Sequence, residues 1–136
     1  MNLQMATRHA LFAILELAAR PDSQIPAADI AAKYGISTNH LSKVMRILGR
    51  EGLVEAVRGV GGGYRFAGNA RRLTLLDLIH IFEPVGVRPA LGAEPGDDTA
   101  EGRGLRLVMD EIDGATRATL SSITIETMLK LIRRQG

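Results

Sequence analysis

The segment of residues 31–48 constrains the fold of this chain more than any other part of the sequence. The small residue Ala31 is followed four residues later by Gly35, then by Ile36 and Ser37, and then by apolar residues at helical spacing. Ala31 lets two helices cross closely, and Gly35 can adopt the conformation of a tight turn. Ile36 can fill the corner between the helices, and Ser37 can cap the second one. The segment therefore predicts a helix-turn-helix.

The second helix of this motif is expected to begin after Ser37 or Thr38 and to have one apolar and one polar face. Its inward residues are Leu41, Val44, Met45 and Leu48. Its outward residues are Asn39, Lys43, Arg46 and Arg50, and the first acid, Glu51, comes at the helix end. Asparagine and arginine can read base edges, whereas lysine and serine can hold phosphates. Taken alone, this face fits either a DNA-reading helix or a helical hairpin with a solvated basic surface.

A glycine-rich hairpin follows the motif directly. Residues 53–57 alternate in polarity, residues 64–67 return as a second strand, and Arg58 leads the loop between them. Glycines at positions 59 and 61–63 would let the backbone approach a duplex closely, and an arginine at such a tip can enter the minor groove. A nucleotide-binding loop would need a following Lys-Ser/Thr and a helix, and neither is present. A helix-turn-helix followed by a basic hairpin predicts the winged version of the motif.

The rest of the sequence predicts further helices. The N-terminal helix is expected to end at Pro21, and the next one to run from Pro26 to Gly35. Other helices are expected at residues 74–82, 105–120 and 125–132, with Thr74 and Thr124 as caps. The expected fold is mainly α with a small β-hairpin: a winged helix-turn-helix domain at 1–83, a Gly- and Pro-rich loop at 84–104, and a long helix with a terminal helix at 105–136.

Charge is distributed unevenly along the chain. Residues 1–72 contain ten basic and five acidic residues, a net charge of +5, whereas the remainder contains seven and ten, a net charge of −3. A basic half is typical of a contact with a polyanion such as DNA. Every apolar run is shorter than the ~18 residues of a membrane span, and the N-terminus lacks the marks of a signal peptide. We therefore expect a cytoplasmic protein with double-stranded DNA, and no membrane, as its partner.

Three segments of the sequence closely resemble one protein family. They are MATRHALFAILELA, IAAKYGISTNHLSKVMRILGREGLVEAVRGVGGGYRFA and LTLLDLIHIFEP, and the likeness spans residues 1–83 and resumes at LSSITI. The family is the Rrf2 family of bacterial transcription regulators, which includes IscR and NsrR, and GLVEAVRGVGGGY is its most distinctive segment here. The resemblance implies a homodimeric repressor or activator of transcription. Of these two roles, we expect repression. Its long helix, about residues 99–120, would pair across the dimer axis.

The resemblance also implies roles for particular residues. The helix positions expected to contact DNA are Ser37, Thr38, Asn39, Lys43 and Arg46, and His40 lies on the same helix near the DNA. The wing positions are Arg58, Gly59, Gly61, Gly62, Gly63 and Tyr64. Thr7 and Arg8 would lie near a phosphate. The residues expected at the dimer interface are Leu105, Val108, Met109 and Ile112.

One departure from the family concerns its cofactor. Several members hold an iron–sulfur cluster through three cysteines in the loop before the long helix, where this chain has RPALGAEPGDDTAEGRG and no cysteine. Cluster-based sensing is therefore not expected, and we expect no cofactor and no metal. The effector, if one exists, is left open by the sequence.

Other features of the sequence could suggest metal, ligand or enzyme sites. His9, His40 and His80 are spread over three expected helices, which argues against a shared metal. The acidic residues between 94 and 101 are expected to be solvated, and the apolar stripe 105–112 to be packing and not a ligand pocket with Phe82 and Val85. An enzyme is not expected, because no nucleophile with a base is evident. The alternative function is a dimeric interaction module that has kept the fold and lost specific DNA binding.

Overall fold

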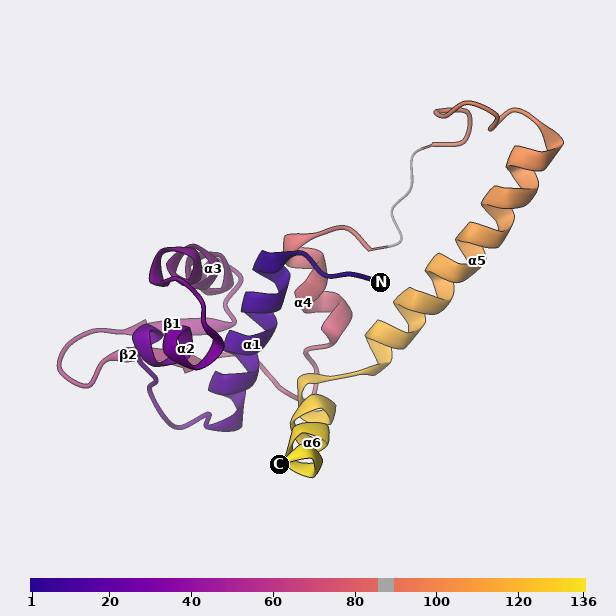
Figure 1. The fold of residues 1–136 in the computed structure, drawn as a ribbon. Coiled ribbons are helices and arrows are strands. Elements are labelled where there is room, and N and C mark those ends of the chain that lie inside the picture. Colours follow the sequence, from indigo (N-terminus) through magenta and orange to yellow (C-terminus); the bar gives the residue numbers. More distant parts are fainter. Residues whose placement is uncertain (86–89) are drawn as a thin grey trace.

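The computed structural model describes residues 1–85 and 90–136. The described elements are α1 (Met5–Ala19), α2 (Ala27–Tyr34), α3 (Thr38–Arg50), β1 (Val54–Val57), β2 (Gly63–Phe66), α4 (Leu75–Phe82), α5 (Ala100–Ser122) and α6 (Ile125–Gln135). Helices α1 to α4, the hairpin and α6 form one body, from which the long helix α5 projects (Figure 1). The mainly helical fold with one antiparallel hairpin confirms the predicted fold class. Among the described helices, none combines the length and apolarity needed to cross a membrane.

The turn between α2 and α3 has the predicted geometry. Helix α2 ends at Gly35, whose φ of 64° lies in the left-handed region that favours glycine. The next residue, Ile36, donates its N–H to the Ala31 carbonyl at 2.9 Å and buries its side chain between the helices. The Ser37 hydroxyl then accepts the His40 N–H at 3.1 Å and caps α3. The helix-turn-helix is thus built from the residues that predicted it.

The wing is fastened to the body along one edge. Strands β1 and β2 pair antiparallel, from Val54 opposite Phe66 to Val57 opposite Gly63. On the other side of β2, Tyr64 exchanges two backbone hydrogen bonds with Ile25, each 2.9 Å long. Ile25, in the segment before α2, therefore pairs with β2 as a third strand that is one residue long.

Helix α1 lies at the centre of the body and supplies much of its core. Its Ala10, Ala13, Ile14 and Leu17 are fully buried, and it contacts the other three helices of the winged domain, strand β2 and α6. The short alanine side chains let neighbouring helices approach closely. Burial of each large apolar side chain contributes about 1.5–3 kcal/mol to folding. The core cluster reaches the inward residues of α3 that the sequence predicted, which are Leu41, Val44, Met45 and Leu48.

A polar cluster on Glu16 joins α1 to α2. The Glu16 carboxylate accepts a hydrogen bond from the Tyr34 hydroxyl at 2.5 Å and one from the Lys33 ammonium, and Arg20 lies 3.5 Å away. Burial raises the pKa of Glu16, but the hydrogen bonds from Lys33 and Tyr34 outweigh it and hold the pKa below its usual value. The carboxylate is therefore ionised at neutral pH and stabilises the start of the helix-turn-helix.

Two short segments tie the C-terminal part of the chain to the winged domain. The Thr74 side chain and the Asp77 side chain form a reciprocal capping box at the start of α4, which confirms the predicted cap. Thr74 also pairs antiparallel with Thr124, the cap of α6. The backbone bonds on either side of this bridge hold α6 and the end of α5 against the body.

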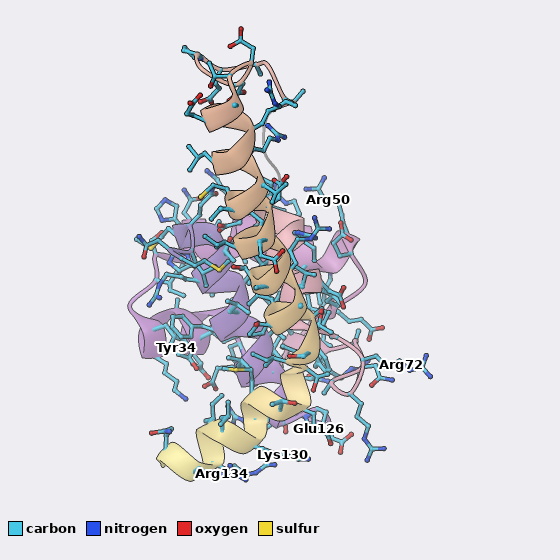
Figure 2. All side chains as sticks on the ribbon, turned by 90° about the vertical axis from the view of Figure 1, so that its right-hand side faces the viewer. Tyr34, Arg50, Arg72, Glu126, Lys130 and Arg134 are labelled. Atoms are coloured by element: carbon cyan, nitrogen blue, oxygen red, sulfur yellow. The ribbon has the colours of Figure 1, made fainter. Side chains whose placement is uncertain are left out.

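Helix α5 begins at Ala100, close to the start at about residue 99 that the resemblance implied and before the end of the loop predicted for residues 84–104. The Thr99 hydroxyl accepts the Gly102 N–H at 2.9 Å and caps the helix. This cap, and not the apolar stripe, fixes where the helix starts. Residues 86–89 of the predicted loop lie outside the described residues. Figure 2 shows the N-terminal half of α5 and the loop before it extending beyond the rest of the molecule.

Candidate nucleic-acid interface

The outward face of α3 is polar and accessible. Its apolar residues pack into the core, which leaves the opposite side to solvent. The predicted contact residues Ser37, Thr38, Asn39, His40, Lys43 and Arg46 are all exposed, as is Arg50. Among the described residues, Lys43 and Arg46 take part in no ion pair. Their charges are therefore available to an external anion.

The tip of the wing lies on the same side of the body as α3, opposite α5 (Figure 1). Arg58 is exposed and, within the described part of the chain, forms no ion pair. Gly59 and Gly61 have φ values of 104° and 76°, so both positions favour glycine. Added Cβ atoms there would meet open space, which keeps the tip narrow and accessible. Arg65, by contrast, pairs with Glu55 across the strands at 2.7 Å.

Gly62 and Gly63 have a role within the wing itself, and their predicted contact with DNA stays a prediction. Both were expected to let the backbone approach DNA, but the structure packs them against the protein's own backbone. A Cβ on Gly62 would collide with the Val57 carbonyl oxygen, and one on Gly63 with the Ile25 carbonyl oxygen. These two glycines are therefore required by the closure of the wing and its attachment to the body.

Tyr64 also serves the attachment of the wing. Its backbone pairs with Ile25, and its half-buried side chain packs against the hydrophobic core. It lies within β2, opposite Ala56, and not in the loop that forms the tip. A direct contact with DNA at this position stays a prediction.

Thr7, which the resemblance places near a phosphate, has a buried side chain that is not available to contact one. Thr7 is 0% exposed, and its hydroxyl donates a hydrogen bond to Glu83 Oε2 at 2.5 Å. The same oxygen accepts the Gln4 N–H at 2.8 Å, so Glu83 caps the start of α1. The neighbouring Arg8 is exposed, with its guanidinium 5.4 Å from the centroid of the Phe12 ring, and it stays available to an anion. Glu83 lies 76 residues from Thr7, so no local pattern could reveal the contact.

The three histidines lie on three different helices, as predicted, but two of them come together in space. The rings of His9 and His40 stack, with centroids 6.5 Å apart and an angle of 26° between their planes. Burial lowers the pKa of the His9 imidazole, and the nearby His40 and Arg8 lower the pKa further. His80 lies elsewhere, with Nε2 3.4 Å from the Val85 carbonyl oxygen. The spacing of residues within one helix could not predict the His9–His40 pair, because the two rings meet where α1 crosses α3.

The apolar residues of α5 are exposed in the single chain. Leu105, Val108 and Ile112 are 64%, 55% and 51% exposed, and Met109 is half-buried. No described residue of this helix is buried. The expected stripe therefore exists, but it is not part of the core of this chain. An exposed apolar stripe of this length is typical of a surface that a partner covers.

The residues of this chain do not fit an iron–sulfur cluster. Such clusters are held mainly by cysteine thiolates, and the chain contains no cysteine. Within the described residues, no three histidine or acidic side chains gather closely enough to hold a metal ion.

Comparisons with known proteins agree with this geometry. The Rrf2 family, described as iron-dependent transcriptional regulators, matches residues 3–131 of this chain. BadM of Rhodopseudomonas palustris, whose name describes an HTH-type transcriptional regulator, is 52% identical over 132 residues, which cover 97% of this chain and 83% of BadM.

Solved structures share the fold. CymR, the global cysteine regulator of B. subtilis, superposes with a TM-score of 0.82 at 24% identity, over 96% of this chain and 98% of CymR. IscR of T. potens has a TM-score of 0.76 at 24% identity, over 96% of this chain and 87% of IscR. Both likenesses confirm the winged helix-turn-helix architecture. The protein therefore belongs to the Rrf2 family of transcriptional regulators.

Proposed function

We propose that this protein is a DNA-binding repressor that recognises an operator through α3 and the wing. The observation that carries the proposal is an exposed surface on two elements that extend to the same side, where Lys43, Arg46 and Arg58 form no ion pair with any described residue. Helix α3 fits the major groove, where Asn39 and Arg46 can read base edges. The narrow wing tip brings Arg58 toward the minor groove.

We propose further that the protein binds DNA as a homodimer. The exposed stripe of α5 supplies a surface that a second copy can cover, and a twofold axis through it would present two copies of α3. Two such helices read half-sites about one helical turn apart, so the operator is roughly palindromic. A dimer bound there excludes other proteins from the same stretch of DNA, and the role that follows is repression.

The experiment is a gel-shift titration with the upstream DNA of the protein's own gene. The test variant carries Arg46→Ala and Arg58→Ala. The control variant carries Arg133→Ala and Arg134→Ala, which removes the same charge from the exposed end of α6.

The test variant should bind at least about 30-fold more weakly, because each specific arginine contact is worth about 1–3 kcal/mol. The control variant should bind as the wild type does. Equal affinity of the test variant and the wild type would show that the site is assigned wrongly. A stable dimer without any salt-dependent DNA binding would favour the interaction module instead.

A further inference from the structure

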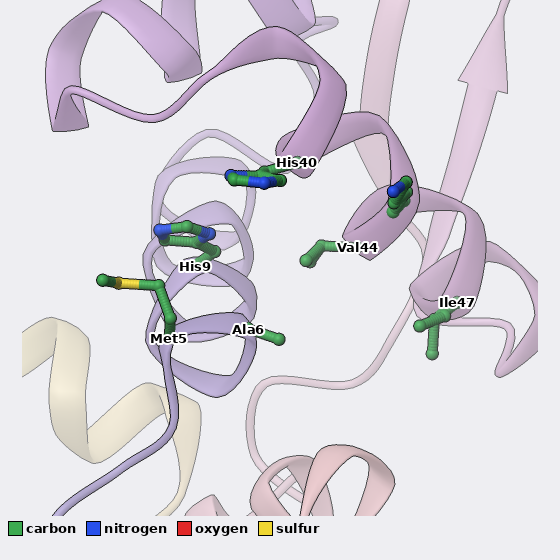
Figure 3. Close-up of a pocket in the computed structure, with 7 residues that line it drawn as sticks. Met5, Ala6, His9, His40, Val44 and Ile47 are labelled. Carbon is green, nitrogen blue, oxygen red and sulfur yellow. The ribbon is translucent and has the colours of Figure 1, made fainter.

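A groove of about 260 Å³ runs between α1 and α3, beside the proposed DNA-reading face (Figure 3). Its walls come from Met5, Ala6 and His9 of α1 and from His40, Lys43, Val44 and Ile47 of α3. His40 and Ile47 line the groove together with residues of α1, whereas Arg46 is exposed and is not among the lining residues. The groove therefore adjoins the DNA-reading face and shares His40 and Lys43 with it.

The lining of the groove is almost entirely apolar, and its described residues include no acid. Aliphatic side chains such as Ala6, Val44 and Ile47 supply most of its lining, and one ammonium and the two stacked imidazoles supply its polar groups. No carboxylate is among the lining residues, and a second hollow on the other side of the histidine pair adds Arg8 and again no acid. Such a lining complements an anion that carries an apolar body, and it disfavours a cation.

We propose that this groove binds a small organic carboxylate with an apolar tail. The tail lies on the aliphatic lining, and the carboxylate faces the Lys43 ammonium and the His9–His40 pair. A carboxylate paired with Lys43 removes one of the cations offered to DNA, so the ligand weakens operator binding. This second effect rests on the proposed function, whereas binding of the ligand itself does not.

The first experiment is a calorimetric and NMR titration of the DNA-free protein with hexanoate, 1-hexanol and hexylamine, which share one chain length and differ in charge. Ala6→Phe fills the groove from an exposed helix position. Ala19→Phe places the same side chain at the exposed far end of α1 and is the control.

Hexanoate should bind the wild type and shift the imidazole resonances of His9 and His40. It should bind about fivefold more tightly than 1-hexanol, because one exposed ion pair is worth up to about 1 kcal/mol. Ala6→Phe should weaken hexanoate binding at least about tenfold, because the apolar contact is lost, and Ala19→Phe should leave it unchanged. Equal affinities for the three compounds, or an unchanged Ala6→Phe, would overturn the proposal. A change of oligomeric state in Ala6→Phe would overturn it too, because the groove would then be an interface between copies.

The second experiment repeats the gel shift in the presence of hexanoate. Hexanoate should weaken DNA binding by the wild type and leave DNA binding by Ala6→Phe unaffected. If hexanoate binds but DNA affinity stays constant, the regulatory half of the proposal is wrong. If the protein binds no DNA at all, the proposed function fails, and the titration without DNA still decides whether the groove is a ligand site.

Discussion

Replacement of Gly63 by alanine tests how the wing is held. Gly63 lies where β2 meets the segment before α2, and an added Cβ would collide with the Ile25 carbonyl oxygen. It would also lie 2.5 Å from the Ile25 carbonyl carbon and 2.7 Å from the Pro26 nitrogen. All three are backbone atoms, so no side chain can rotate away. The strand must shift from the body to accept the methyl group.

The cost of this shift follows from the contacts that it breaks. Overpacking of this kind costs about 1–3 kcal/mol. The two hydrogen bonds between Ile25 and Tyr64, each 2.9 Å long, lengthen with the shift, and each is worth about 0.5–1.5 kcal/mol. The free energy of unfolding of Gly63→Ala should therefore fall by about 2–6 kcal/mol.

Gly61→Ala is the matched control. Gly61 also has a positive φ, of 76°, but an added Cβ there meets no atom within 4 Å. Its cost should be backbone strain alone, about 1–2 kcal/mol. The assay is urea unfolding followed by circular dichroism, with the Ile25 amide resonance as a local probe. Equal unfolding free energies for the two variants, with an unmoved Ile25 amide, would refute the account of the wing.

Four further predictions concern other parts of the molecule. Glu16→Gln should lower the free energy of unfolding by about 1–2 kcal/mol at pH 7. Because folding lowers the pKa of Glu16, this difference between the variant and the wild type should vanish as the pH falls through the lowered pKa. A difference in thermal unfolding that does not depend on pH would contradict this. Thr7→Val removes the buried hydroxyl that donates a hydrogen bond to Glu83. The free energy of unfolding, measured with urea, should fall by about 1–3 kcal/mol, and the DNA affinity measured at low temperature should not change. Weaker DNA binding by the folded variant would show that Thr7 belongs to the interface. Val108→Glu places a charge on the exposed stripe of α5 and should shift sedimentation from dimer to monomer; an unchanged dimer would place the interface elsewhere. Protein purified without oxygen should show no visible iron–sulfur absorption, because the chain has no cysteine thiolates, and a coloured, iron-containing preparation would contradict this.

The parts of the fold that rest on neighbouring residues were predictable from the sequence. The turn of the helix-turn-helix depends on Gly35, Ile36 and Ser37, which are consecutive and interact within one helical turn. The capping box at Thr74 spans three residues. Local patterns of this kind act through contacts that the sequence itself displays.

The parts that rest on distant contacts were not predictable. From the sequence alone, Thr7 resembles an exposed residue at the start of a helix. In the structure, its hydroxyl donates a hydrogen bond to Glu83, which follows α4. His9 and His40 lie in one place because α1 crosses α3. Gly63 must be a glycine because the Ile25 backbone packs directly against it. The spacing of the glycines in the sequence does not reveal this contact. Each of these contacts depends on how the helices pack, and spacing along one element carries no information about it.

In the proposed complex, two copies of α3 and of the wing read one operator. Hydroxyl-radical footprinting tests it most directly, on genomic fragments that the wild-type protein selects from a library. Two protected patches are expected, about one helical turn apart and related by a twofold axis, and both should disappear together in the Arg46→Ala and Arg58→Ala variant. A single unpaired patch, or protection that the variant retains, would contradict it.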